Sequence, residues 1–249
     1  MSFRYCFLRS DRLILPDLVA RHRQPELIDA PDLPSERHEG ALRALARVNA
    51  LSRAAPRIWR EIRRLTEADA LGRIRVLDVA CGGGDVAVAL ARRAARSGVD
   101  LEVHGCDVSP TALDFARKNA ERAGVQAHFF QLDALRGEIP DGYDVVCSSL
   151  FLHHLDDDAA VALLAAMAEK ASRMVLVQDL RRTIVGYVLA YGTLRVISRS
   201  HVAHTDGPRS VEGAFSLEEA AELASRAGLQ GARVEPCWPQ RFQLIWRHA

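Results

Sequence analysis

The 249-residue sequence lacks several patterns that would assign it to a specialised class. No stretch approaches the roughly 18 consecutive apolar residues of a membrane-spanning helix, so we expect no stable membrane insertion. Residues 1–13 contain Arg4, Arg9 and Arg12 but no apolar segment of signal-peptide length, which argues against export. Repeats and low-complexity segments are absent, and 49% hydrophobic residues exclude wholesale disorder. These features predict a globular cytoplasmic protein.

The sequence has few cysteines, and none occurs in a C-x-x-C pair or at zinc-ligand spacing. They therefore predict neither a disulfide framework nor a metal site. In a reducing cytoplasm they are expected to pack as small apolar side chains. The five cysteines are Cys6, Cys81, Cys106, Cys147 and Cys237.

An excess of one charge is also missing, because the formal net charge is only +1. Such a chain produces no strong field for gripping a nucleic acid. Charge is nevertheless uneven, since residues 181–210 contain five arginines and one acidic residue. This basic segment is either a solvated loop or a surface that contacts an acidic or phenolic ligand.

Short apolar runs alternate with long amphipathic segments from Arg73 onward. Strand-like runs cover residues 75–80, 101–107, 125–133, 143–149 and 174–180, and helical patterns cover residues 85–96, 110–123 and 156–172. This alternation predicts an α/β fold with a doubly wound, Rossmann-like and mostly parallel sheet.

The two ends of the chain differ from this alternating body. Residues 1–72 predict an irregular arm with four prolines, followed by a helical cap with helices from Glu36 and around 58–65. In residues 73–249 we expect the main domain, with an insertion at 181–215 that includes a helix at 184–197. A helix from Ser216 to Gly228 and two final strands, antiparallel in the sheet, complete it.

A glycine turn joins the first strand directly to the first helix of the main domain. Gly82, Gly83 and Gly84 allow backbone amides at a helix N-terminus to approach a ligand closely. Asp107 ends the next strand, where a carboxylate can bind ribose hydroxyls. Dinucleotides and adenosyl cofactors both fit this combination.

Two further acidic residues favour an adenosyl cofactor that carries positive charge. Asp78 ends the first strand, where a carboxylate would repel a pyrophosphate but attract a cation. Asp133 ends the third strand and can accept a hydrogen bond from an adenine amino group. A capping or solvated role explains any one acid alone, but the three occur at the ends of successive strands.

Four segments together resemble the motifs of class I S-adenosylmethionine (SAM)-dependent methyltransferases. They are VLDVACGGG, VHGCDVSPTAL, FFQLDA and YDVVCSSLFLHHL, and the resemblance covers about residues 73–249. It implies that Asp78 and the amides near Gly82 and Gly84 bind the methionine part, with Ala80 where a glycine is frequent. It also assigns Asp107 and Val108 to the ribose, Asp133 and Ala134 to the adenine, and Ser148, Ser149 and Leu150 to the methionine side.

A narrower resemblance is to the menaquinone/ubiquinone-type methyltransferases. Asn49, Leu51, Ser52, Trp59 and Arg60 match their pre-motif region, and the layout around Tyr187 is similar. The G-x-R-N sequence usual in quinone enzymes is replaced here by Leu-His-His-Leu at 152–155. Many polyketide-associated methyltransferases share the double histidine, so the resemblance implies a phenolic or polyketide-derived acceptor.

Three histidines are candidate general bases for such an acceptor. His153 and His154 follow the fourth strand, and His204 precedes Asp206 in the basic segment. The alternative for each of these histidines is a purely structural role. The candidate acceptor-binding residues are Arg181, Arg182, Tyr187 and Arg209. The three arginines are candidates because cations near a phenol favour its anion.

Other classes explain less of the sequence. A nicotinamide oxidoreductase leaves Asp78 and Asp133 without a role, and a nucleic-acid methyltransferase lacks a strongly basic surface. A non-catalytic cofactor-binding subunit would need no acceptor site. We therefore expect an enzyme that methylates a hydroxyl of a small molecule, with methylation of a quinol-like ring carbon as the alternative. A monomer or a homodimer is expected.

Overall fold

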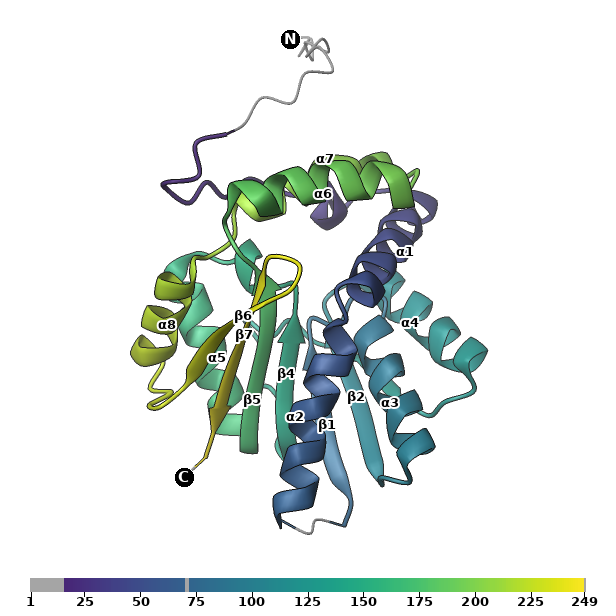
Figure 1. Cartoon of the computed structure of the whole chain (residues 1–249). Coiled ribbons are helices and arrows are strands. Elements are labelled where there is room, and N and C mark those ends of the chain that lie inside the picture. Colours follow the sequence, from purple (N-terminus) through teal and green to yellow (C-terminus); the bar gives the residue numbers. More distant parts are fainter. Residues whose placement is uncertain (1–15, 70–71, 249) are drawn as a thin grey trace.

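The computed structural model describes residues 16–69 and 72–248, and it contains a seven-stranded sheet (Figure 1). The strand order is β3-β2-β1-β4-β5-β7-β6, with β1 to β5 parallel and β7 antiparallel to both of its neighbours. This confirms the predicted Rossmann-like sheet with antiparallel C-terminal strands. The strands are β1 (Ile74–Val79), β2 (Leu101–Asp107), β3 (His128–Gln131), β4 (Tyr143–Ser149), β5 (Ala171–Leu180), β6 (Arg233–Cys237) and β7 (Arg241–Arg247).

Helices cover both faces of the sheet and its carboxyl edge. The buried side chains of α2, α3 and α4 belong to the core on one face, and those of α5 and α8 to the core on the other. Figure 1 shows α6 and α7 lying across the upper, carboxyl edge, beside the end of α1. The helices are α1 (Ser35–Leu51), α2 (Ala54–Asp69), α3 (Asp85–Ser97), α4 (Pro110–Ala123), α5 (Asp157–Lys170), α6 (Ile184–Ile197), α7 (His201–Glu212) and α8 (Leu217–Arg226), with short 3-10 turns η1 (Leu27–Asp29) and η2 (Leu152–His154).

Burial on both faces explains why the central strands are almost continuously apolar. In β1, Ile74 and Val76 belong to one core, whereas Leu77 and Val79 belong to the other. A parallel strand covered by helices on both sides requires apolar residues at consecutive positions rather than at alternate ones. Polar residues are therefore concentrated where these strands end.

The sequence-based element bounds need three corrections. β3 covers only residues 128–131, and residues 171–172 begin β5 instead of ending the preceding helix. Residues 201–212 form α7, a helix that was not predicted from the sequence. The helix forms because Ser200 caps it, and Gly207 allows close packing: a Cβ there would lie 2.0 Å from Leu194 Cδ1.

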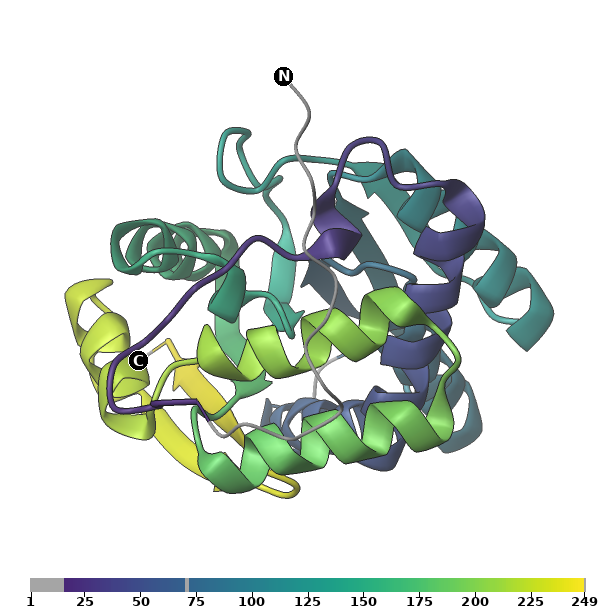
Figure 2. The same cartoon turned by 90° about the horizontal axis from the view of Figure 1, so that it is seen from above.

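The described part of the arm crosses the carboxyl edge next to α7 (Figure 2). Backbone N–H groups of Leu27 and Ile28 donate to the Asp206 carboxylate at 2.8 and 3.0 Å. The N–H of His22 donates to the carbonyl of Glu212. These hydrogen bonds attach an irregular segment to α7. The sequence features of residues 1–13, including Cys6, lie outside the described residues.

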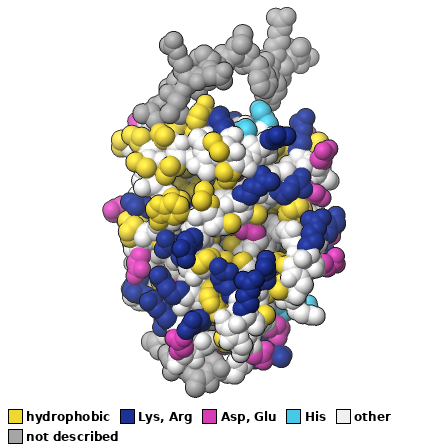
Figure 3. Space-filling model, turned by 45° about the vertical axis from the view of Figure 1, so that its right-hand side comes forward, with side chains coloured by type: hydrophobic (Ala, Val, Ile, Leu, Met, Phe, Trp, Pro, Cys, Tyr) yellow, Lys and Arg dark blue, Asp and Glu magenta, His cyan; other side chains and the backbone are white. Residues whose placement is uncertain are grey.

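The surface combines charged and apolar side chains. Figure 3 shows one face on which Lys and Arg side chains are spread among apolar ones. In the described part of the chain, no helix has the length and apolar character needed to cross a membrane. On the face in Figure 3, the basic side chains are mixed with apolar ones.

Phe242 provides a test of the C-terminal strand pair. Its side chain in β7 is fully buried in the core shared with α5 and α8. Because Phe→Ala in a core removes apolar burial and leaves a cavity, Phe242→Ala should lower the free energy of unfolding by about 3–5 kcal/mol. Urea unfolding measures it, with the exposed Val196→Ala as the control, expected within about 0.5 kcal/mol of wild type. Equal stability of the two variants would contradict the assigned packing.

Candidate active site

A cleft of about 680 Å³ opens at the carboxyl edge of the sheet. Loops after β1, β2, β3 and β4 line it together with the arm and α1. Ligands bind at this edge in open α/β sheets because the strand ends leave polar loops there. The expected cofactor positions that line the cleft are Ala80, Gly82, Asp107, Val108, Asp133, Ala134, Ser149 and Leu150. Asp78, Gly84 and Ser148 are not part of this lining.

The glycine turn is held in a conformation that other residues adopt poorly. Gly82 and Gly84 have φ of 51° and 70°, and a Cβ on Gly84 would lie 2.8 Å from that of Ala116. The N–H of Gly82 donates to Asp107 Oδ2 at 2.8 Å. The turn is therefore fixed against both α4 and the end of β2.

Asp107 and Asp133 present carboxylates to the cleft. Asp107 Oδ1 accepts the N–H of Ser109 at 2.9 Å, and Asp133 Oδ1 accepts the N–H of Leu135 at 3.0 Å. Burial raises the pKa of Asp107, and the two backbone donors oppose this shift. Each carboxylate oxygen retains a lone pair, so both residues can accept further hydrogen bonds from a ligand.

Buried polar atoms lie beneath the turn. Asp78 is 1% exposed, and burial together with the charge of Asp85 raises its pKa to about 8. Ser148 donates to the carbonyl of Val79 at 2.9 Å. Asp78 Oδ2 and Ser149 Oγ have no hydrogen-bond partner among the described residues. Polar atoms of this kind are satisfied by a ligand that brings donors and positive charge.

His154 lines the cleft, whereas His153 is buried behind it. His154 Nδ1 lies 3.0 Å from Asp29 Oδ2, and its Nε2 lies 3.7 Å from Glu26 Oε2. His153 Nδ1 lies 2.6 Å from Asp179 Oδ1. Burial opposes a charge on His153, but the carboxylates of Asp179 and Glu26 outweigh it and raise its pKa to about 10. The two carboxylates therefore favour the protonated form of His153 in this structure, and its expected catalytic role stays a prediction.

His204 is not part of the cleft. Its Nε2 lies 2.8 Å from the carbonyl oxygen of Ser198 and 3.1 Å from that of Leu194. Both acceptors lie at the C-terminal end of α6, where the Leu194 carbonyl also accepts the N–H of Ser198. In this structure the Nε2 nitrogen of His204 therefore contacts the end of α6 and not the cleft, and a catalytic role for His204 stays a prediction.

The predicted acceptor-binding arginines also make structural contacts. Arg182 pairs with Glu219 and donates to the carbonyl oxygens of Ala214 and Leu18. Arg209 donates to the carbonyl of Pro25 in the arm. None of Arg181, Arg182, Tyr187 and Arg209 lines the cleft. These four side chains therefore lie away from the cleft in this structure, and their expected contact with the acceptor stays a prediction.

The arm supplies the residues that sequence reasoning missed. Its lining residues are Ile28, Asp29, Ala30, Pro31 and Leu33, and α1 adds His38, Leu42, Leu45 and Asn49. An irregular proline-rich segment has no periodicity from which to infer the face that it buries. The prolines around it were the available signal, and they indicate only a defined, non-helical path.

Comparisons with known proteins agree with this geometry. Residues 76–172 match the family model described as a methyltransferase domain. The ubiquinone biosynthesis O-methyltransferase of Xylella fastidiosa (strain 9a5c) is 30% identical over 183 residues, which cover 70% of this chain and 69% of that protein. The enzyme of the same name from Bordetella parapertussis is 30% identical over 169 residues, covering 66% of this chain and 65% of that one.

Solved structures share the fold at low sequence identity. Magnesium protoporphyrin IX methyltransferase from Synechocystis PCC 6803, with S-adenosylhomocysteine (SAH) bound, has a TM-score of 0.57 at 16% identity. That alignment covers 80% of this chain and 83% of the other. An O-methyltransferase family 2 protein from Planctomyces limnophilus, in complex with apigenin, has a TM-score of 0.58 at 20% identity. This alignment covers 88% of this chain and 63% of the other.

The fold and the cleft are thus those of an enzyme that transfers a methyl group from an adenosyl cofactor. The chain belongs to the family of SAM-dependent methyltransferases. SAM fits the cleft, because its ammonium, hydroxyl and amino groups supply donors for the carboxylates and for the unpaired buried oxygens.

Asp107→Ala should weaken SAM binding. The change removes an acceptor of charge-assisted hydrogen bonds, which contribute about 1.5–3 kcal/mol each, so the dissociation constant should rise at least about tenfold. Isothermal titration calorimetry measures the constant. Asp114→Ala, at an exposed position in α4, is the matched control. Equal affinity of wild type and Asp107→Ala would remove Asp107 from the cofactor site.

SAM binding should also release a proton near neutral pH. Below its pKa of about 8, Asp78 is protonated in the free protein, and a nearby cation favours the carboxylate. The affinity should therefore rise as the pH increases from 6 toward 8. Calorimetry at pH 7 in buffers of different ionisation enthalpy measures the release. Asp78→Asn should lose it, and an unchanged release in that variant would assign the proton to another group.

Proposed function

We propose that the chain transfers the methyl group of SAM to a hydroxyl oxygen of a small aromatic acceptor, phenolic or polyketide-derived. The observation that carries this proposal is His154 at the cleft wall, flanked by apolar side chains and by the arm. The similarity to O-methyltransferases supports it. In the reaction the C–S bond breaks, an O–C bond forms, SAH leaves, and the hydroxyl gives up its proton.

The lining divides the cleft into a polar and an apolar part. The polar part contains Asp85, Asp107 and Asp133. The apolar part contains Ile28, Leu33, Phe151 and Leu155, and the Phe151 ring stacks on that of His154 with 6.0 Å between the ring centres. An apolar wall with a single polar group suits an aromatic ring that carries a hydroxyl. We assign the first part to the cofactor and the second to the acceptor.

The cofactor roles follow from this division. Asp107 and Val108 contact the ribose, and Asp133 and Ala134 contact the adenine. Ser149 and Leu150 lie along the methionine part, while Asp78 acts from below as a negative charge. Methyl transfer is an in-line displacement, so these residues mainly position the sulfonium and exclude water.

We assign to His154 the activation of the acceptor hydroxyl. An ordinary phenol has a pKa near 10 and reacts poorly until its proton leaves. The carboxylates of Asp29 and Glu26 face the two nitrogens of the His154 ring, at 3.0 Å from Nδ1 and 3.7 Å from Nε2. Glu26 and Asp29 both come from the arm, so activation requires the arm to lie across the cleft.

His154→Ala should slow methylation of phenols by at least about tenfold at pH 7, because a general base accelerates such a reaction by roughly 10²–10⁴-fold. The rate should recover partly at alkaline pH, where the phenol ionises unaided. A panel of phenols, pyrones and quinols with mass-spectrometric identification of the methylated atom is the measurement.

The exposed His128→Ala is the matched control for this experiment. It removes an imidazole on β3, outside the cleft lining. A wild-type rate in His154→Ala at pH 7 would refute the role of His154. Methyl transfer to ring carbon with every acceptor would instead establish the alternative of carbon methylation.

A further inference from the structure

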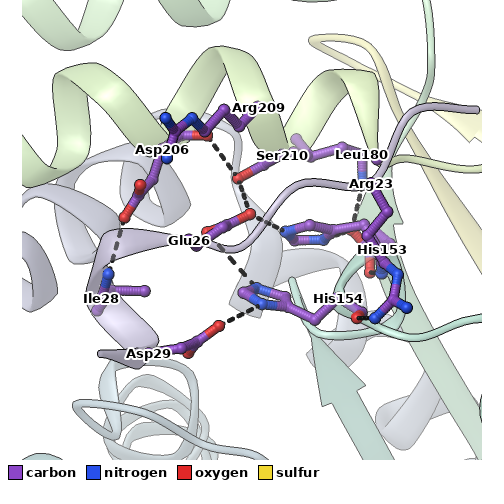
Figure 4. Close-up of polar contacts among 12 residues, drawn as sticks. Arg23, Glu26, Ile28, Asp29, His153, His154, Leu180, Asp206, Arg209 and Ser210 are labelled. Carbon is purple, nitrogen blue, oxygen red and sulfur yellow. Dashed lines mark hydrogen bonds and ion pairs between the residues drawn. The ribbon is translucent and has the colours of Figure 1, made fainter. Parts of the chain in front are cut away.

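Three potential metal ligands from two distant segments meet at one point beside the cleft. Glu26 belongs to the arm, and His153 and His154 form η2 (Figure 4). One ligand atom from each residue lies within 4.8 Å of the other two. Figure 4 shows the two imidazole rings on the same side of the Glu26 carboxylate.

The distances fit coordination better than direct hydrogen bonding. Nε2 of His153 lies 3.5 Å from Glu26 Oε1, and Nε2 of His154 lies 3.7 Å from Glu26 Oε2. Good N–H···O hydrogen bonds are shorter, at about 2.7–3.2 Å. Ligands about 2.0–2.2 Å from a tetrahedral zinc ion lie roughly 3.4 Å from one another. Both histidine–glutamate separations are therefore close to those between two ligands of one zinc ion.

Each of the three residues is oriented by a second group. Nδ1 of His153 faces Asp179 at 2.6 Å, and Nδ1 of His154 faces Asp29 at 3.0 Å. Glu26 Oε1 accepts the hydroxyl of Ser210 at 2.6 Å. Metal-binding histidines almost always use the other ring nitrogen in this way, which leaves Nε2 free to coordinate.

Charge also favours a cation at this point. The carboxylates of Glu26, Asp29 and Asp179 surround two imidazoles, and Glu26 and Asp179 are almost completely buried. Arg21 and Arg23 approach from outside, where they bind the carbonyl oxygens of His153 and His154. Either protons on the histidines or a metal ion must offset the remaining negative charge.

We propose that Glu26, His153 and His154 bind a first-row divalent cation of the zinc class. Two histidines and one carboxylate form a ligand set that leaves further positions for water or for an oxygen of the acceptor. Because Glu26 lies in the arm, the bound ion fastens the arm to η2 and closes one side of the cleft.

The consequence for catalysis rests on the proposed function, whereas binding of the ion does not. An ion at Nε2 of His154 occupies the lone pair that would otherwise accept the hydroxyl proton. The ion then takes over activation, because a coordinated hydroxyl loses its proton far more readily.

Cobalt binding by the tag-free full chain, stripped with a chelator, tests the site. We expect one equivalent of Co²⁺, visible d–d absorption of a four- or five-coordinate ion, and displacement by Zn²⁺. Glu26→Gln and His154→Ala should raise the dissociation constant more than about tenfold, and Asp29→Asn about 10–100-fold. Glu36→Gln and His201→Ala, both exposed, are the matched controls and should bind Co²⁺ like wild type.

The Glu26→Gln variant decides the test even if loss of a histidine disturbs folding, because glutamine keeps the shape of the Glu26 side chain in the arm. Absence of the d–d absorption in the wild type would overturn the proposal, as would an unchanged constant in both Glu26→Gln and His154→Ala. Failure of the proposed function is distinct: a chain that binds one Co²⁺ but methylates no phenol keeps the metal site and loses the assigned acceptor.

Discussion

The buried contact between Asp179 and His153 determines how the acceptor side of the molecule is built. Asp179 ends the apolar part of β5 and is 1% exposed, so its charge must be compensated within the protein. It accepts the backbone N–H and the ring of His153, and the N–H of Leu180. These bonds hold η2 against the end of β5, and they turn the following residue, His154, toward the cleft. The imidazole of His153 in turn faces Glu26, which extends the same set of charges into the arm.

Arginines hold the arm where apolar packing is sparse. Arg21 donates to the carbonyl oxygens of Gly213, His153 and Leu155, and its guanidinium lies 3.7 Å from the centre of the Phe215 ring. Arg182 binds the carbonyl of Leu18. The basic residues that suggested an acceptor site therefore satisfy backbone carbonyls of loops, for which the planar guanidinium with several donors is well suited. Lysine, with one compact charge, could not make the same set of bonds.

The cofactor half of the cleft could be predicted from the sequence, because its parts are local. Gly82, Gly84 and Asp107 follow directly from strand ends, and the parallel sheet brings such ends to one edge. The acceptor half depends on pairs far apart in the chain, such as Glu26 with His153 and Asp206 with Leu27. No periodicity specifies these pairs. The same limit explains why α7 was not predicted. The packing of Gly207 against Leu194 favours this helix, and it outweighs the low helix propensity of Gly207 and Pro208.

This division has a consequence for how ligands enter. The glycine turn is part of the sheet and its apolar core, whereas the arm is attached by hydrogen bonds and ion pairs to α7 and η2. Segments with few buried apolar contacts open at a lower free energy than the core. The cofactor site is thus built independently of the arm. Since Glu26 and Asp29 belong to the arm, the polar environment of His154 depends on the arm lying across the cleft. The activation of the acceptor that we propose at His154 therefore requires the arm in this position, where it also excludes water from the acceptor.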